Sequence, residues 1–118
     1  MNKLIVVLKT GREDPEVVSI AMALAINGLM FDKEVILFLQ GRAGNLARKG
    51  FVENIAFPPF PPVKELLSSI LEFGGRIIVC SPCLEGYHFS KDELIESAEV
   101  AGGPFLINEM EDAQLLMY

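Results

Sequence analysis

The two cysteines of the chain, Cys80 and Cys83, are the residues best suited to covalent chemistry. They lie three positions apart in the segment Cys80-Ser81-Pro82-Cys83, directly after a short apolar run. A thiolate is a nucleophile, and a pair at this spacing is compatible with redox, metal and sulfur chemistry. Alternatively, Cys80 is a small apolar residue that ends a buried strand. The spacing marks a candidate site and leaves its reaction open.

The residues around the pair favour Cys80 as the reactive cysteine. Pro82 suits the first turn of a helix, so the Cys80 sulfur is expected near helix amides that favour a thiolate. Cys83 should turn into that helix, which predicts faster alkylation of Cys80. The single histidine, His88, follows in a loop and is a base, a ligand or an exposed loop residue. Two thiolates and one imidazole leave zinc one protein ligand short, so no metal and no cofactor is expected.

Short apolar runs predict the strands that must position these residues. They cover residues 4–8, 34–39, 76–79 and 113–118, with a shorter run at 99–101. Continuous runs of this kind are typical of strands buried on both faces of a parallel sheet.

A long helix is predicted between the first two strands. Asp14 supplies its N-cap and Pro15 its first residue, and Gly28 is the expected stop. Between residues 17 and 26 only Ser19 is polar, so this helix lacks a solvent face and needs a cover besides the sheet. A second subunit is one candidate for that cover.

Further helices are predicted after the second strand. Apolar residues at helical spacing predict a helix over residues 63–71, which ends at Gly74. Shorter helices are expected at 43–49, at 91–97 behind a capping box, and from Pro104. Residues 52–57 are expected to be extended, before a proline-rich loop.

This alternation of strands and helices predicts an α/β fold. The expected architecture has three layers, α/β/α, around a mainly parallel sheet of about five strands, as in Rossmann-like and flavodoxin-like proteins. One domain is expected to span residues 1–118. In such a sheet the binding crevice lies outside the carboxyl ends of the strands. The residues expected to line it there are Lys9, Thr10, Gly11, Arg12, Gly41, Arg42, Ser81, Pro82 and His88.

Composition limits the possible partners. The net charge of -6 has the wrong sign for binding nucleic acid, and no apolar stretch is long enough for a membrane span. The first apolar run is too short for a signal peptide, so a cytoplasmic location is expected. Hydrophobic residues make up 51% of this small chain, which predicts apolar surface covered in a homo-oligomer.

The order of these features resembles the DsrE/DsrF-like family. The similarity rests on the first strand, the Thr10-Gly11-x-x-Asp14-Pro15 segment, the apolar helix that follows, and the strand that ends in Cys80. The resemblance implies a DsrE-like fold, assembly into trimers or hexamers, and sulfur relay as a persulfide on Cys80. Where relatives often have Arg-Gly after this cysteine, the chain has Glu85-Gly86.

Three hypotheses of function follow. The first is a sulfur carrier or sulfurtransferase-like protein, in which Cys80 holds sulfane sulfur and Cys83 resolves or shares it. Its partners are sulfur donor and acceptor proteins or small sulfane-sulfur compounds. The second is a dithiol oxidoreductase, although a thioredoxin-like protein should carry its motif after an early strand of a mixed sheet. The third is a non-catalytic oligomeric module whose cysteines are incidental.

Overall fold

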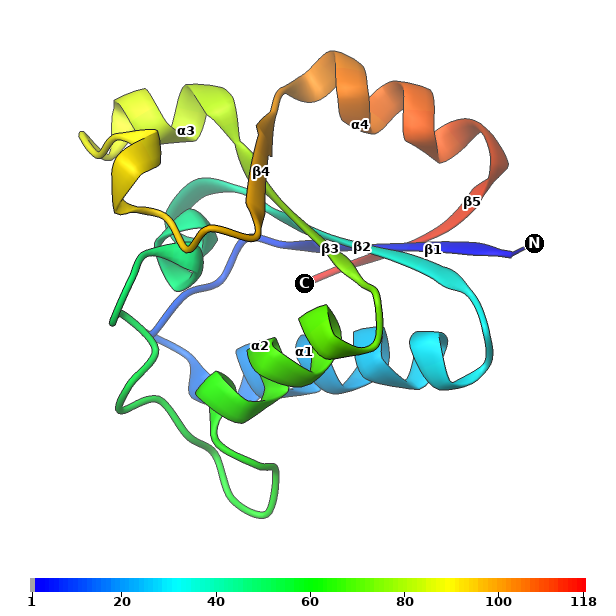
Figure 1. Cartoon of the computed structure of the whole chain (residues 1–118), viewed down its shortest axis with the longest axis horizontal. Coiled ribbons are helices and arrows are strands. Elements are labelled where there is room, and N and C mark those ends of the chain that lie inside the picture. The colour runs from blue at the N-terminus through cyan, green and yellow to red at the C-terminus, as the bar shows by residue number, and fades with distance from the viewer. Residues whose placement is uncertain (1) are drawn as a thin grey trace.

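A computed structural model describes residues 2–118, and its sheet has five strands that all run parallel. The strands are β1 (Lys3–Leu8), β2 (Glu34–Leu39), β3 (Arg76–Cys80), β4 (Ala98–Ala101) and β5 (Ala113–Met117). Their order across the sheet is β4-β3-β2-β1-β5 (Figure 1). The predicted parallel sheet is confirmed, and each predicted run lies within two residues of an observed strand.

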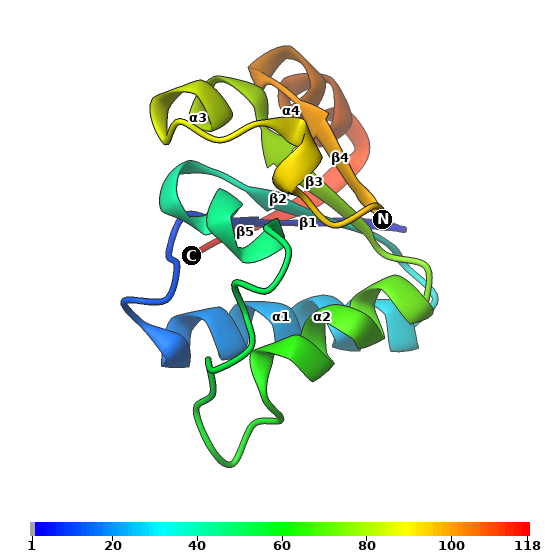
Figure 2. The same cartoon turned by 60° about the vertical axis from the view of Figure 1, so that its left-hand side comes forward.

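Helices cover both faces of this sheet. They are α1 (Pro15–Met30), α2 (Val63–Glu72), α3 (Ser81–Gly86) and α4 (Gly103–Glu109), with 3-10 turns η1 (Gly41–Ala47), η2 (Lys91–Glu93) and η3 (Met110–Asp112). Helices α1 and α2 lie side by side against one face, and α4 lies over the other (Figures 1 and 2). The three-layer α/β architecture predicted from the sequence is therefore confirmed.

Alternate residues of each strand enter two separate cores, because side chains of a strand point to opposite faces in turn. In β1, Leu4, Val6 and Leu8 belong to a large core under α1 and α2, which we call the helix-pair core. Ile5 and Val7 belong to a smaller core under α4, which we call the α4 core. The buried members of the α4 core are Ile5, Val7, Ile36, Phe38 and Ile78.

Helix α1 begins where the sequence predicts and ends later. The Val17 N–H donates to Asp14 Oδ1 over 3.3 Å, which confirms the N-cap. Gly28 is a buried residue of the last turn of α1 and does not end the helix. A Cβ atom there would lie 2.8 Å from a Leu4 methyl carbon and 3.0 Å from one of Val35. Close packing on the sheet, and not helix termination, explains this glycine.

The cover that α1 was expected to need comes in part from α2. Val18, Met22 and Ala25 of α1 share the helix-pair core with Leu66 and Ile70 of α2. Between residues 2 and 118, no helix is long and apolar enough to cross a membrane.

Three local predictions differ from the structure. Residues 91–97 form the single turn η2, although the capping box between Ser90 and Glu93 is present. The Ile95 N–H donates to Ala47 O over 2.8 Å, which draws the chain alongside η1 before a second helical turn forms. The helix expected at 43–49 is the 3-10 turn η1, and turns rather than extended chain occupy residues 51–54.

Candidate functional site

Cys80 is the last residue of β3 and the N-cap of α3. Strand alternation places its side chain on the α4 side of the sheet, where it packs against the α4 core. Its neighbour in register on β4 is Ala101. Cys80 is therefore half-buried and lies at the carboxyl end of β3, which has a strand on each side.

Cys83 is the third residue of α3, and its sulfur lies beside that of Cys80. The two Sγ atoms are 2.8 Å apart and not bonded, and both cysteines are half-buried free thiols. An N-cap side chain naturally lies near the third helical residue, so the Cys-x-x-Cys spacing and the start of α3 together create the contact.

A backbone amide from a different strand end holds Cys83. The Gly41 N–H donates to Cys83 Sγ over 3.1 Å. Gly41 follows β2 and has φ +56, a left-handed conformation that strains residues with a Cβ atom. A hydrogen bond from an amide to sulfur stabilises the anionic form of that sulfur. The turn after β2 therefore presents a donor to the thiol pair.

The electrostatic environment of Cys80 differs from the sequence expectation. Burial raises the pKa of the Cys80 thiol to about 11, and its hydrogen bond with Cys83 adds to the increase. The Cys83 N–H lowers this pKa and is outweighed. Helix α3 has only six residues, so it supplies little compensating charge stabilisation. At neutral pH Cys80 is a thiol and not the ready thiolate that the sequence favours.

Close contacts bring several predicted lining residues to the same edge of the sheet. A Cβ atom on Gly11 would lie 3.1 Å from the Arg42 carbonyl oxygen, so the ends of β1 and β2 touch. A Cβ atom on Gly102 would lie 3.3 Å from Ser81 Oγ, so the ends of β3 and β4 touch as well. Together with the bond between Gly41 and Cys83, these contacts form a continuous chain along the carboxyl ends of four strands.

The cations expected at the site are engaged elsewhere or point into solvent. The Arg42 guanidinium lies 3.6 Å from a Glu13 carboxylate oxygen. The Arg12 guanidinium stacks 4.2 Å from the centre of the Phe51 ring. The Lys9 side chain is exposed. The structure therefore shows no cation of the expected set in contact with a cysteine sulfur, within residues 2–118.

The remaining predicted lining residues are placed as follows. Thr10 is half-buried next to the end of β1, and Pro82 is exposed in the first turn of α3. His88 is exposed with φ +56, and its ring makes no hydrogen bond or ion pair with any described residue. In the described chain, no three His, Cys, Asp or Glu side chains are grouped closely enough to hold a metal ion.

The role of the Gly41 amide was missed at the sequence level. Gly41 was predicted only to line the crevice, because sequence spacing does not show which backbone donor reaches which sulfur. Gly44 was missed entirely, although a Cβ atom there would lie 3.3 Å from a Val79 methyl carbon. This close approach packs η1 onto β3 and so sets the position of the Gly41 amide. In the sequence, the available sign of this packing is the pair of glycines, Gly41 and Gly44, that flanks Arg42 and Ala43.

Comparison with known proteins agrees with this architecture. Residues 2–117 match the model of the DsrE/DsrF-like family. The uncharacterized protein MJ0760 of Methanocaldococcus jannaschii is 28% identical over 108 residues, which is 92% of this chain and 39% of that protein. The chain thus spans about two fifths of the length of this curated relative.

Solved structures with the same fold are more distant in sequence. The ychN protein from E. coli is 19% identical, with a TM-score of 0.80 and full coverage of both chains. A protein of unknown function from Methanobacterium thermoautotrophicum, MTH1491, is 15% identical, with a TM-score of 0.76 and full coverage of both chains. These likenesses show a shared fold.

Proposed function

The chain belongs to the DsrE/DsrF-like family, and we propose that it is a sulfur carrier that holds sulfane sulfur as a persulfide on Cys80. The observation that supports the proposal best is the free thiol pair at the carboxyl edge of the sheet, with 2.8 Å between the sulfurs. A parallel sheet exposes its binding crevice at this edge. Donor and acceptor are sulfur-transfer proteins or small sulfane-sulfur compounds.

Loading requires Cys80 to lose its proton as it attacks the donor. The Cys83 N–H stabilises the negative charge that forms on the Cys80 sulfur, and the proton passes to solvent, so loading does not depend on the Cys83 thiol. A bond then forms between Cys80 Sγ and the terminal sulfane sulfur of the donor, and the donor's S–S bond breaks. A persulfide donor leaves as a thiolate, and a polysulfide leaves as a polysulfide anion shorter by one sulfur. An acceptor thiolate later attacks the outer sulfur and frees Cys80.

The S–S distance also favours a second candidate, a dithiol oxidoreductase. In that reaction the two thiols are oxidised to a disulfide while a substrate disulfide is reduced to two thiols. The raised pKa of Cys80 slows both reactions, because each of them needs Cys80 as a thiolate. The position of the motif after the third strand of a wholly parallel sheet is a further difference from the expectation for thioredoxin-like proteins.

Intact-mass spectrometry after treatment with inorganic polysulfide separates the two candidates. A carrier needs one thiol, so Cys83→Ser should gain sulfur that reductant removes, whereas Cys80→Ser should not. An oxidoreductase needs both cysteines, so each variant should lose turnover of a test disulfide and neither should gain sulfur. Glu85→Gln changes an exposed residue of α3 and serves as the matched control. Absence of added sulfur in Cys83→Ser would refute the carrier.

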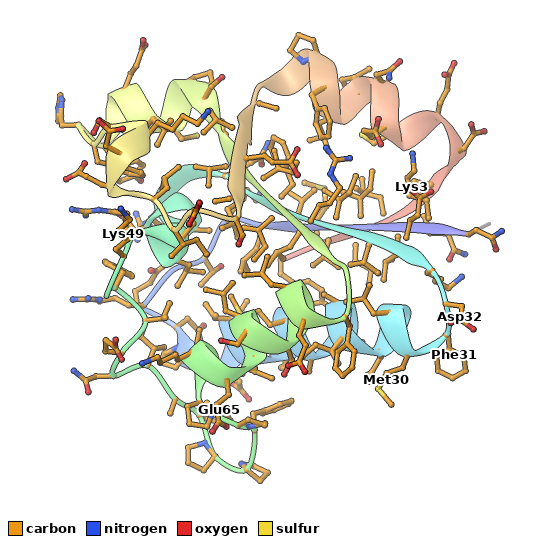
Figure 3. All side chains as sticks on the ribbon, in the orientation of Figure 1. Lys3, Met30, Phe31, Asp32, Lys49 and Glu65 are labelled. Atoms are coloured by element: carbon orange, nitrogen blue, oxygen red, sulfur yellow. The ribbon has the colours of Figure 1, made fainter. Side chains whose placement is uncertain are left out.

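The assembly and location of the carrier stay predictions. A homo-oligomer, a trimer or a hexamer, is expected in the cytoplasm. Met30 and Phe31 at the end of α1 are 69% and 80% exposed and project away from the sheet (Figure 3). Exposed apolar side chains of this size are consistent with an interface. An oligomer that never binds sulfur would favour the third hypothesis, a non-catalytic module.

A further inference from the structure

The second cysteine is not needed to carry sulfur, yet it occupies a defined position. Cys83 Sγ lies 2.8 Å from Cys80 Sγ and accepts a hydrogen bond from the Gly41 N–H. A disulfide bond is about 2.05 Å long, so closing one requires the sulfurs to approach by less than about 1 Å. Both sulfurs are free and half-buried.

From this geometry we infer that the chain has a second activity: Cys83 discharges the persulfide on Cys80 as hydrosulfide and closes a disulfide between the two cysteines. The inference rests on the proposed function, since it starts from the loaded carrier. It makes the chain a source of sulfide whenever no acceptor thiol takes the sulfane sulfur first.

The discharge step balances without any added oxidant. The Cys83 thiolate attacks Cys80 Sγ, a bond forms between the two Sγ atoms, and the bond from Cys80 Sγ to the outer sulfur breaks. The outer sulfur leaves with the bonding electron pair as hydrosulfide and is reduced, while the two cysteine sulfurs are oxidised. A dithiol reductant then returns the disulfide to two thiols.

Two features of the site and one property of the leaving group support attack by Cys83. Its sulfur is already within bonding reach of Cys80, so the step is intramolecular and gains the advantage of a held reactant. The Gly41 amide stabilises negative charge on the attacking sulfur. Hydrosulfide is a better leaving group than an alkyl thiolate, because thiols of lower pKa leave faster.

The test follows sulfide and protein mass together under anaerobic conditions. Wild type, Cys83→Ser, Cys83→Ala and Glu85→Gln are treated with inorganic polysulfide and rapidly desalted. Wild type and Glu85→Gln should release one sulfide per loaded chain and end lighter than the reduced protein by two hydrogen atoms. Both Cys83 variants should retain the added sulfur and release sulfide at least about a hundredfold more slowly. Two different replacements guard against an effect of one side chain on folding.

Other outcomes overturn the inference in distinguishable ways. Equal release rates in wild type and both Cys83 variants, or a stable persulfide in wild type, would refute discharge by Cys83 and leave the carrier intact. A wild-type disulfide formed without sulfide would also refute it. If no chain gains sulfur and no sulfide is released, the carrier itself fails and the inference falls with it.

Discussion

The two faces of the sheet are built in different ways. The helix-pair core is large and lies under α1 and α2, which have 16 and 10 residues. The α4 core has five buried members and lies under a helix of seven residues. No residue of α4 itself is buried, whereas six residues of α1 are. Apolar burial therefore stabilises the first face more than the second.

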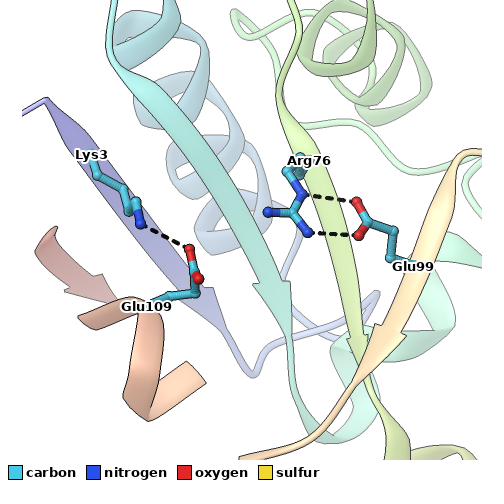
Figure 4. Close-up of polar contacts among 4 residues, drawn as sticks. All are labelled: Lys3, Arg76, Glu99 and Glu109. Atoms are coloured by element: carbon cyan, nitrogen blue, oxygen red, sulfur yellow. Dashed lines mark hydrogen bonds and ion pairs between the residues drawn. The ribbon is translucent and has the colours of Figure 1, made fainter. Parts of the chain in front are cut away.

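Ion pairs add to the contacts on the α4 side. Lys3 Nζ lies 2.9 Å from a Glu109 carboxylate oxygen, and Arg76 makes a bidentate pair with Glu99 over 2.7 and 3.0 Å (Figure 4). The Arg76 guanidinium also stacks 5.5 Å from the centre of the Phe105 ring. Cys80 packs against the α4 core, which is the smaller of the two cores. From this comparison we expect the Cys80 sulfur to lie on the side of the sheet that opens more easily.

Truncation of one core residue on each face should give the largest contrast. Leu37 is fully buried in the helix-pair core, and Leu106 is half-buried beside the α4 core. Leu37→Ala should lower the free energy of unfolding by about 2–5 kcal/mol, and Leu106→Ala by about 1 kcal/mol. Urea unfolding followed by circular dichroism measures both. Equal losses would contradict the difference between the faces.

A methyl group added at Gly28 tests the close packing of α1. Its Cβ would contact Leu4 and Val35 at 2.8 and 3.0 Å, so Gly28→Ala should destabilise the protein by about 1–3 kcal/mol. The matched control is Gly103→Ala, because a Cβ atom at the start of α4 meets no atom within 4 Å. Urea midpoints distinguish the two variants. A stabilised Gly28→Ala protein would mean that this glycine merely weakens the helix.

The alkylation rates of the two cysteines test the raised pKa of Cys80 on the α4 side of the sheet. The pKa of Cys80 is raised to about 11, so its thiolate fraction should increase about tenfold per pH unit from neutral pH to near that value. Alkylation of Cys80 should therefore be slow at neutral pH, whereas the sequence predicts that it is fast. Peptide mapping after iodoacetamide treatment reads both sites. If the alkylation rate of Cys80 levels off near neutral pH, Cys80 is already a thiolate there, as the sequence predicts, and its pKa is not raised.

Loss of the pair between Arg76 and Glu99 should have the smallest effect. Both side chains are nearly half exposed, so Glu99→Gln should cost under about 1 kcal/mol. The hydrogen bond with Arg76 lowers the pKa of Glu99, so its contribution is present above the ordinary carboxyl pKa and is lost as pH falls through the lowered value. Urea unfolding at neutral and acidic pH checks this, with Glu96→Gln as control. If the difference in unfolding free energy between wild type and Glu99→Gln persists at acidic pH, the predicted direction of the pH dependence is wrong.

Local sequence signals were sufficient for most of the fold. Branched apolar runs located β1, β2 and β3, and the Asp14-Pro15 pair located the start of α1. Gly28 was misread because a helix stop and a close helix-to-sheet contact both favour glycine. The helix expected at 91–97 failed because backbone pairing with η1 competes with it.

The candidate site was predictable in position and not in chemistry. The strand that ends in Cys80 and the rule for parallel sheets place the pair at the carboxyl edge. The burial that raises the pKa of Cys80 arises from the α4 core, which joins segments far apart in the chain. The donor to Cys83 comes from Gly41, 42 residues away. Contacts of this range depend on tertiary packing and not on spacing.

Single-turnover transfer from loaded Cys83→Ser protein tests the carrier most directly. This variant keeps Cys80 and lacks the sulfur that would discharge it. After polysulfide loading, desalting and addition of a monothiol acceptor, intact-mass spectra are taken over time. The account predicts that the protein first carries the mass of one extra sulfur on Cys80 and then returns to its unloaded mass as the acceptor gains that sulfur. A protein that gains no sulfur, or holds it without passing it to any thiol, would contradict the account.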